Sequence, residues 1–114
     1  MTTVPLNETV PVVLNGAGGG TAKVGPLTAR EVWHPSAAAV KVSTIENEAQ
    51  CLIYVGDSPT QANFMDGTYS GSSGDSSDRV GATTVRVGWY VWAVWTGGDP
   101  GATATLTVTG TKDV

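Results

Sequence analysis

The sequence has few charged side chains, a single cysteine and a single histidine. Charged residues make up 14% of the 114 residues, whereas an ordinary soluble domain has about 25%. Because Cys51 has no second cysteine to pair with, an internal disulfide and a cysteine-based metal cage are both excluded. A nucleophile pair of Cys51 and His34 would need a third group to orient it, and nothing in the spacing supplies one. We therefore expect no enzyme and no cofactor.

Positive charge and long apolar runs are also scarce. The formal net charge is −4 and the six cationic side chains are scattered, so no basic tract exists to follow a phosphate backbone and we expect no nucleic-acid partner. No apolar run approaches the roughly 20 residues of a membrane-spanning helix, and the N-terminal residues lack the pattern of a signal peptide. We expect synthesis in the cytoplasm and no membrane partner.

Glycine, proline and β-branched residues recur too often for a helical apolar stripe to persist. Short alternating runs, typical of strands, occur instead at residues 10–14, 21–27, 30–33, 38–43, 50–55, 80–87, 88–96 and 102–109. With turn signals between them, these runs predict an all-β fold: an antiparallel β-sandwich of about seven to nine short strands, Ig-like or jelly-roll-like. A closed barrel is the alternative. We expect one domain over residues 10–114, preceded by an N-terminal arm at residues 1–9.

Residues 88–96 hold three of the four tryptophans and are apolar on both faces of the expected strand. One row carries Trp89, Val91, Ala93 and Trp95, and the other carries Tyr90, Trp92 and Val94. A domain of this size buries one row in its own core, so the other needs a cover. We expect the bulkier Tyr90 row to face inward and the Trp89 row to accept a neighbouring subunit. The interaction residues predicted on this basis, with two from the arm, are Trp33, Trp89, Val91, Trp95, Val4 and Leu6.

Two further patterns are weaker. The glycine-rich residues 15–23 lack the Gly-Lys-Ser/Thr order of a phosphate loop and predict a hairpin turn. Residues 66–78 read as an exposed acidic loop in which Asp66, Asp75 and Asp78 offer oxygen ligands of the kind Ca²⁺ prefers, without the ordered spacing of a calcium loop. We assign no metal site, and calcium binding stays an alternative.

Three segments together resemble small virion proteins of tailed bacteriophages that infect actinobacteria: residues 54–57 (Tyr-Val-Gly-Asp), residues 66–75, and residues 90–104 around Trp-Thr-Gly-Gly-Asp-Pro-Gly. The resemblance covers most of the chain and carries over no catalytic or binding residue. It implies a β-sandwich present in many copies on a virion, bound to the major capsid protein or other virion proteins. The expected role is capsid decoration as a homo-oligomer, a trimer in our hypothesis. The alternative is a tail or head-fibre adhesion module that binds host-surface carbohydrate through exposed tryptophans.

Overall fold

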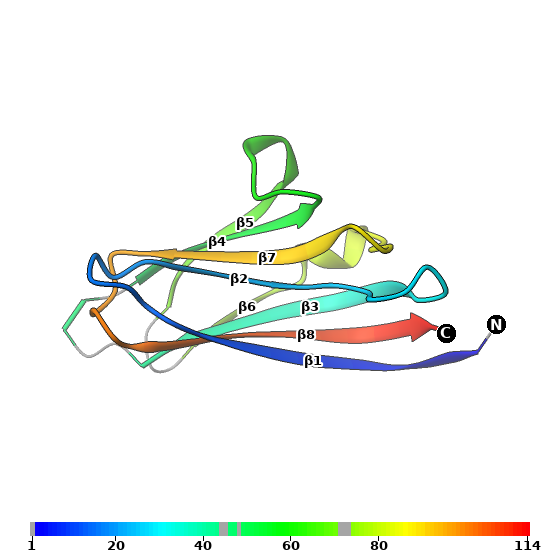
Figure 1. Cartoon of the computed structure of the whole chain (residues 1–114), viewed down its shortest axis with the longest axis horizontal. Helices are drawn as coiled ribbons and strands as arrows, with labels where there is room; N and C mark the ends of the chain where they lie inside the picture. Colours follow the sequence, from blue (N-terminus) through cyan, green and yellow to red (C-terminus); the bar gives the residue numbers. More distant parts are fainter. Residues whose placement is uncertain (1, 44–45, 48, 71–73) are drawn as a thin grey trace.

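The computed structural model describes residues 2–43, 46–47, 49–70 and 74–114. The chain forms two packed sheets in a body of 47 × 25 × 21 Å (Figure 1). Two short 3-10 helices, η1 (Gln61–Asn63) and η2 (Arg79–Ala82), lie in the connections. The strands are β1 (Thr3–Val13), β2 (Gly20–Val24), β3 (Val32–Val42), β4 (Ala49–Gly56), β5 (Phe64–Ser70), β6 (Asp75–Ser77), β7 (Tyr90–Thr96) and β8 (Thr103–Asp113). Within the described residues, no helix is long and apolar enough to cross a membrane.

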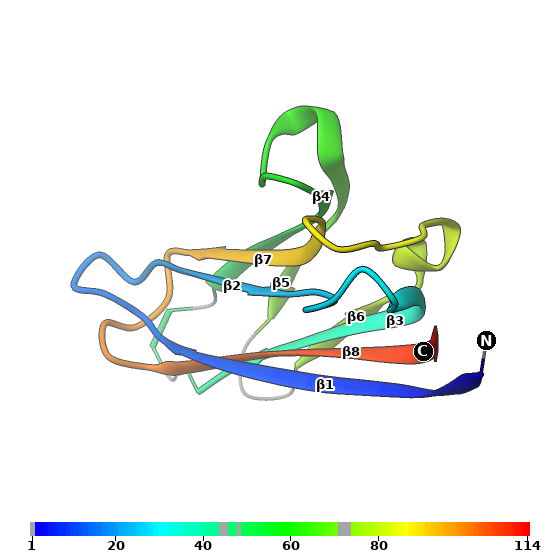
Figure 2. The ribbon, with the colours of Figure 1, turned by 45° about the vertical axis from the view of Figure 1, so that its right-hand side comes forward.

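The strand order is that of a jelly roll. One sheet has the order β1-β8-β3-β6 and the other β2-β7-β4-β5, with every pair antiparallel. Four of the pairs are those of one long hairpin: β1 with β8, β2 with β7, β3 with β6, and β4 with β5. The hairpin is wrapped so that β8 also pairs with β3, and β7 with β4. The turned view in Figure 2 shows the two layers facing each other. The predicted antiparallel β-sandwich is confirmed, and the sheets stay separate rather than closing into one barrel.

The core lies between the two sheets and follows the period-two alternation of the strands. Val40 on β3, Leu106 on β8, Ile53 on β4 and Trp95 on β7 are at most 2% exposed. On β8, Ala104, Leu106 and Val108 point inward while the intervening threonines face out. The alternation predicted for residues 102–109 is therefore confirmed.

Several segments differ from the sequence-based expectation. The runs at residues 30–33 and 38–43, expected as two strands, join in the single strand β3. Residues 3–9, expected as an arm, form the first part of β1 and pair with β8 as far as Asp113. The prediction of a strand at residues 80–87 is wrong, because the run begins inside a 3-10 helix and only Val85 makes a β-bridge. Val80 belongs to η2, and Val85 makes an isolated bridge with Trp33.

The outer edge of β1 is protected by its two prolines. Thr2 and Val114 exchange backbone hydrogen bonds, and the Leu14 N–H donates to the Ala102 carbonyl, so the even-numbered residues point their N–H groups toward β8. Pro5 and Pro11 are odd-numbered and sit where the N–H would point away from the sheet. Their missing donors weaken this edge as a template for pairing with another strand.

One glycine in β8 is required by a bulge in β3. The pairing register shifts between Pro35 and Ala37, and Gly110 lies opposite this irregularity with a φ of +151°. A Cβ at Gly110 would come within 2.4 Å of the His34 carbonyl oxygen. Only glycine lets the two strands approach this closely.

Candidate functional site

The two rows of β7 face opposite to the prediction. Val91, Ala93 and Trp95 are fully buried between the sheets, while Tyr90, Trp92 and Val94 point outward and are half-buried. Trp95 is accommodated because its register neighbours, Gly20 on β2 and Cys51 on β4, are small and leave space for the indole. Side-chain volume within the row was therefore the wrong criterion, since the neighbouring strands decide how much room each position has.

The outward row of β7 continues across its sheet as an aromatic surface. Trp92 lies in register with Lys23 on β2 and Tyr54 on β4, and Tyr54 pairs in turn with Phe64 on β5. We call this surface the aromatic face and define it by Leu52, Tyr54, Phe64, Tyr90, Trp92 and Val94. Phe64 is 38% exposed, whereas Tyr54 is only 9% exposed and mainly supports the Phe64 ring from below.

The rings of the aromatic face hold one another in place. The centroids of Tyr90 and Trp92 are 5.6 Å apart and those of Tyr54 and Phe64 5.8 Å apart, both edge to face. The Lys23 ammonium lies 4.6 Å from the Tyr90 centroid and 5.2 Å from that of Trp92, a cation–π arrangement. The Trp92 indole N–H donates to the Gly56 carbonyl at 3.0 Å. The face is thus fixed before any partner arrives.

The outer face of the opposite sheet has a different chemistry. β8 presents a row of threonines there, and the hydroxyls of Thr107 and Thr9 on β1 are hydrogen-bonded at 2.9 Å. We call this surface the threonine face; its outward residues on β8 are Thr103, Thr105, Thr107, Thr109 and Thr111. The threonine hydroxyls can form hydrogen bonds with water, so this side of the sandwich is stable without a cover.

A cleft of about 530 Å³ opens between the sheets, where β2 ends at Val24 while β1 and β8 continue. We call it the inter-sheet cleft. One sheet contributes Glu8 on β1 and Lys112 on β8 from its inward rows. The other contributes Lys23 and Tyr90 from its outer face, which borders the cleft at the edge strand β2. The connection between β2 and β3 closes it with Leu27 and Glu31, and Trp33 lies at its base.

The charged groups of the inter-sheet cleft are arranged around one ammonium. The Nζ of Lys112 lies 3.3 Å from Oε1 of Glu31 and 4.0 Å from Oε1 of Glu8. The Trp33 indole N–H donates to the same Glu31 oxygen at 3.2 Å. The hydrogen bond from Trp33 lowers the pKa of Glu31 below its usual 4.5, and Lys112 adds to this against the opposing effect of burial. Glu31 is therefore held as a carboxylate that faces the cleft.

Most of the interaction residues predicted from the sequence are enclosed by the chain itself. Trp33 is 3% exposed and Leu6 2%, and Val91 and Trp95 are fully buried. The expectation that these four dock a partner is wrong, since each lies on an inward row of its strand. The alternative, in which four exposed tryptophans bind carbohydrate, loses two of its four indoles, because Trp33 and Trp95 are core residues.

The other two predicted interaction residues remain accessible. Trp89, which precedes β7, is 49% exposed, and Val4 is half-buried on the inward row of β1. Trp89 lies next to the aromatic face in the chain, so of the predicted set it is the residue best placed for contact with a partner.

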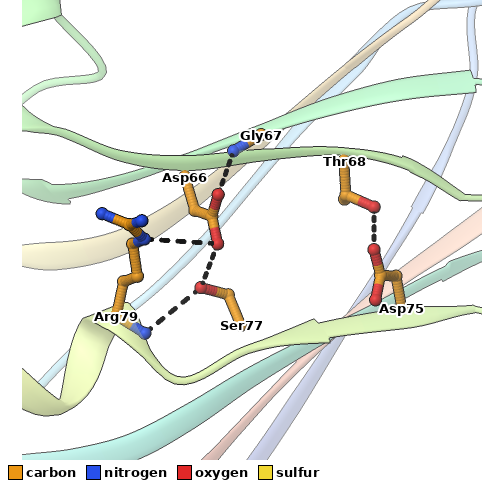
Figure 3. Close-up of polar contacts among 6 residues, drawn as sticks. All are labelled: Asp66, Gly67, Thr68, Asp75, Ser77 and Arg79. Carbon is orange, nitrogen blue, oxygen red and sulfur yellow. Dashed lines mark hydrogen bonds and ion pairs between the residues drawn. The ribbon is translucent and has the colours of Figure 1, made fainter.

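The acidic segment forms a polar seam between two sheet edges, where β5 lies beside β6 (Figure 3). The Ser77 hydroxyl donates to Asp66 at 2.7 Å, and the Arg79 Nε lies 4.0 Å from the same carboxylate oxygen. Thr68 donates to Asp75 across the seam. These bonds join one edge of the sandwich, so residues 66–70 and 74–78 are not the free loop that was expected, while residues 71–73 of that prediction lie outside the described residues. Across the described parts of the chain, no three metal-ligating side chains cluster.

Cys51 and His34 lie on opposite sides of the fold. Cys51 points into the core from β4, whereas His34 faces outward from β3 and lies 3.0 Å from the Asp113 carboxylate. They form no nucleophile pair. Comparison with known protein families and with curated proteins finds no match to the chain.

Five site residues were not expected from the sequence: Tyr54 and Phe64 of the aromatic face, and Glu8, Glu31 and Lys112 of the inter-sheet cleft. Period-two counting from Leu6 would have placed Glu8 on an inward row, and counting from Leu106 and Val108 would have done the same for Lys112. A charged residue on a core row is the signal of a site that opens to solvent. Nothing local in the sequence brings these residues together, because they lie on β1, β8 and the loop before β3.

Proposed function

We propose that this protein is a non-enzymatic structural component of a phage virion that decorates the capsid by docking its aromatic face on the lattice. One observation carries the proposal: β7 is apolar on both rows, and the chain fully covers only one of them. The half-buried row is joined by Tyr54 and Phe64 into a preformed apolar surface. Surfaces of this kind mark contacts between proteins.

The difference between the two outer faces gives the subunit an orientation. The aromatic face would lie against the partner and the threonine face would point to solvent. With so few charged side chains, the subunit relies on apolar burial and hydrogen bonds rather than on ion pairs for attachment. A partner that presents an apolar patch with few charges, such as a major capsid protein at a lattice junction, fits this chemistry.

The size of the aromatic face sets how much contact it can supply. The aromatic face lies on β4, β5 and β7. Three strands about 4.8 Å apart and the 7 residues of β7 at about 3.4 Å each cover roughly 14 × 24 Å, or about 340 Å². A stable interface needs about 800 Å² per partner. The remainder would come from neighbouring groups, for which Trp89 and Leu27, 49% and 88% exposed, are the best placed. In this proposal the copies associate with one another as well as with the lattice.

The test is binding of the purified chain to particles assembled without it. The double variant Trp92→Ala with Phe64→Ala should lose at least tenfold in affinity, since two central aromatic side chains of an interface are each worth more than about 1 kcal/mol. The matched control, Thr107→Ala on the threonine face, should bind like the parent chain. A parent chain that stays monomeric and does not bind particles, or a double variant that binds unchanged, would contradict the proposal.

A further inference from the structure

We propose that the inter-sheet cleft binds a neutral sugar in its pyranose form, a function beyond the docking of the aromatic face, with which the cleft shares Tyr90 and Leu27. The cleft has the size of a small-molecule site: about 530 Å³, where such sites span about 300 to 1,000 Å³. It also has the usual composition of one, with apolar walls and a few polar groups that converge from different strands.

The charge of the cleft selects against ions. Its two lysines, Lys23 and Lys112, balance its two glutamates, Glu8 and Glu31, so no net field attracts an anion or a cation. Lys112 already contacts both carboxylates. A zwitterion such as an amino acid would have to separate these ion pairs. When the groups are partly buried, the free energy lost on breaking the pairs exceeds the free energy gained from the new contacts. A neutral polar ligand leaves them intact.

The same pairs suit a ligand that carries adjacent hydroxyl groups. A carboxylate offers about four acceptor sites and an ammonium three donors. Glu31 uses one oxygen for both Lys112 and Trp33, so acceptor sites remain. A hydroxyl can donate to such a carboxylate and accept from an ammonium at once. Adjacent ring carbons of a pyranose each carry a hydroxyl, so the sugar offers several such donor and acceptor groups side by side.

The apolar walls suit the C–H face of a pyranose. Tyr90 presents its ring from one sheet, and Leu27, 88% exposed, lies on the connection that closes the cleft. Lys23 lies over one face of the Tyr90 ring, 4.6 Å from its centroid, and brings a hydrogen-bond donor to this wall. The polar groups are held by one another and the ring by Trp92, so little freedom is lost on binding.

The test is a nuclear magnetic resonance titration of the full-length, ¹⁵N-labelled chain. The probes are the methyl glycosides of glucose, galactose and N-acetylglucosamine, with L-alanine and inorganic phosphate as ionic comparisons. We expect at least one glycoside to bind with a dissociation constant of about 1 mM. It should shift the Trp33 indole N–H signal and the Leu27 and Tyr90 amides. No shift of these signals by any glycoside, or shifts caused by alanine or phosphate instead, would overturn the proposal.

A matched pair of variants locates the site. Glu8→Gln removes a charge at the cleft and should weaken glycoside binding about tenfold, the value of one hydrogen bond to a charged group. Glu46→Gln makes the same change between β3 and β4, where the Glu46 amide donates to Asp99, and should have no effect. Equal effects of the two variants would contradict the assignment. Because Glu8→Gln leaves the aromatic face intact, particle binding should persist, so this proposal and the docking proposal can fail separately.

A final comparison uses oligosaccharides of whichever sugar binds. Tighter binding of the oligosaccharide than of its methyl glycoside would assign the cleft to a residue within a polysaccharide chain. Equal binding would assign it to a single terminal or free sugar.

Discussion

Truncation of the two β7 tryptophans that face opposite ways should have unequal effects on stability. Trp95 is fully buried, and removal of a buried aromatic side chain costs about 3 to 5 kcal/mol. Trp92 is half-buried and would lose its hydrogen bond to Gly56, about 1 kcal/mol, its edge-to-face contact with Tyr90, about 1 kcal/mol, and its contact with Lys23, about 0.5 kcal/mol. The three contributions of Trp92 are not independent, so their sum overestimates the cost. We therefore expect Trp92→Ala to cost about 2 kcal/mol of stability and Trp95→Ala about 4 kcal/mol.

The measurement is urea unfolding followed by far-ultraviolet circular dichroism. With a slope of about 1.5 kcal/mol per molar urea, the midpoint should fall by about 2.7 M for Trp95→Ala and by about 1.3 M for Trp92→Ala. The reasoning would be refuted by equal shifts, or by a larger shift for Trp92→Ala, because the Trp92 row would then be the buried one.

A second substitution at Trp95 guards against complete loss of the fold. In the described structure the Trp95 indole N–H is buried without a hydrogen-bond partner, and a group in that state costs about 1 to 3 kcal/mol. Trp95→Phe removes this donor while it keeps an aromatic ring in the core. We expect it to lie within about 1 kcal/mol of the parent chain, since the relief offsets part of the lost volume.

Three further predictions concern single groups. Burial raises the pKa of Cys51 to about 12, so a thiol reagent at mildly alkaline pH should label the chain only in denaturant; fast labelling of the native protein would place Cys51 outside the core. Hydrogen bonds from Thr3, and then from His34, hold the pKa of Asp113 below its usual 3.8. Its contribution to stability is therefore complete above the unfolded-state pKa and is lost as pH falls through the lower folded-state value, and Asp113→Asn should flatten the acid side of a stability profile relative to the parent. Gly110→Ala should destabilise by more than about 1 kcal/mol in thermal unfolding, because its Cβ would meet the His34 carbonyl; an unchanged melting temperature would show that the bulge tolerates a side chain.

Local sequence was sufficient to predict the fold class, because the relevant patterns span only a few residues. The turn at residues 97–101 is an example. A Pro-Gly pair such as Pro100-Gly101 is typical of the centre of a type II turn, and the structure has the Ala102 N–H donating to the Asp99 carbonyl with Gly101 at a φ of +79°. The alternation of β8 was equally readable, because each inward residue is flanked by threonine.

The candidate site depends on strand order, which no local pattern encodes. Which row of β7 is buried depends on Gly20 and Cys51, which are more than forty residues from Trp95 in the sequence. The inter-sheet cleft likewise combines Glu8 with Glu31 and Lys112, and only the β1 to β8 pairing brings the first and last of these together. The sequence was enough to recognise that β7 is apolar on both faces, but it did not indicate which of the two faces is exposed.

The pairing of Thr2 with Val114 has a practical consequence for engineering (Figure 1). Because the first and last described residues are hydrogen-bonded neighbours, a short linker could splice them, and new ends could be opened in the turn at residues 97–101, at the far tip of the sandwich. Such a circular permutant would present a fused reporter from the opposite tip. Under the docking proposal, fusions at the two tips would show which tip must stay unobstructed for binding to particles.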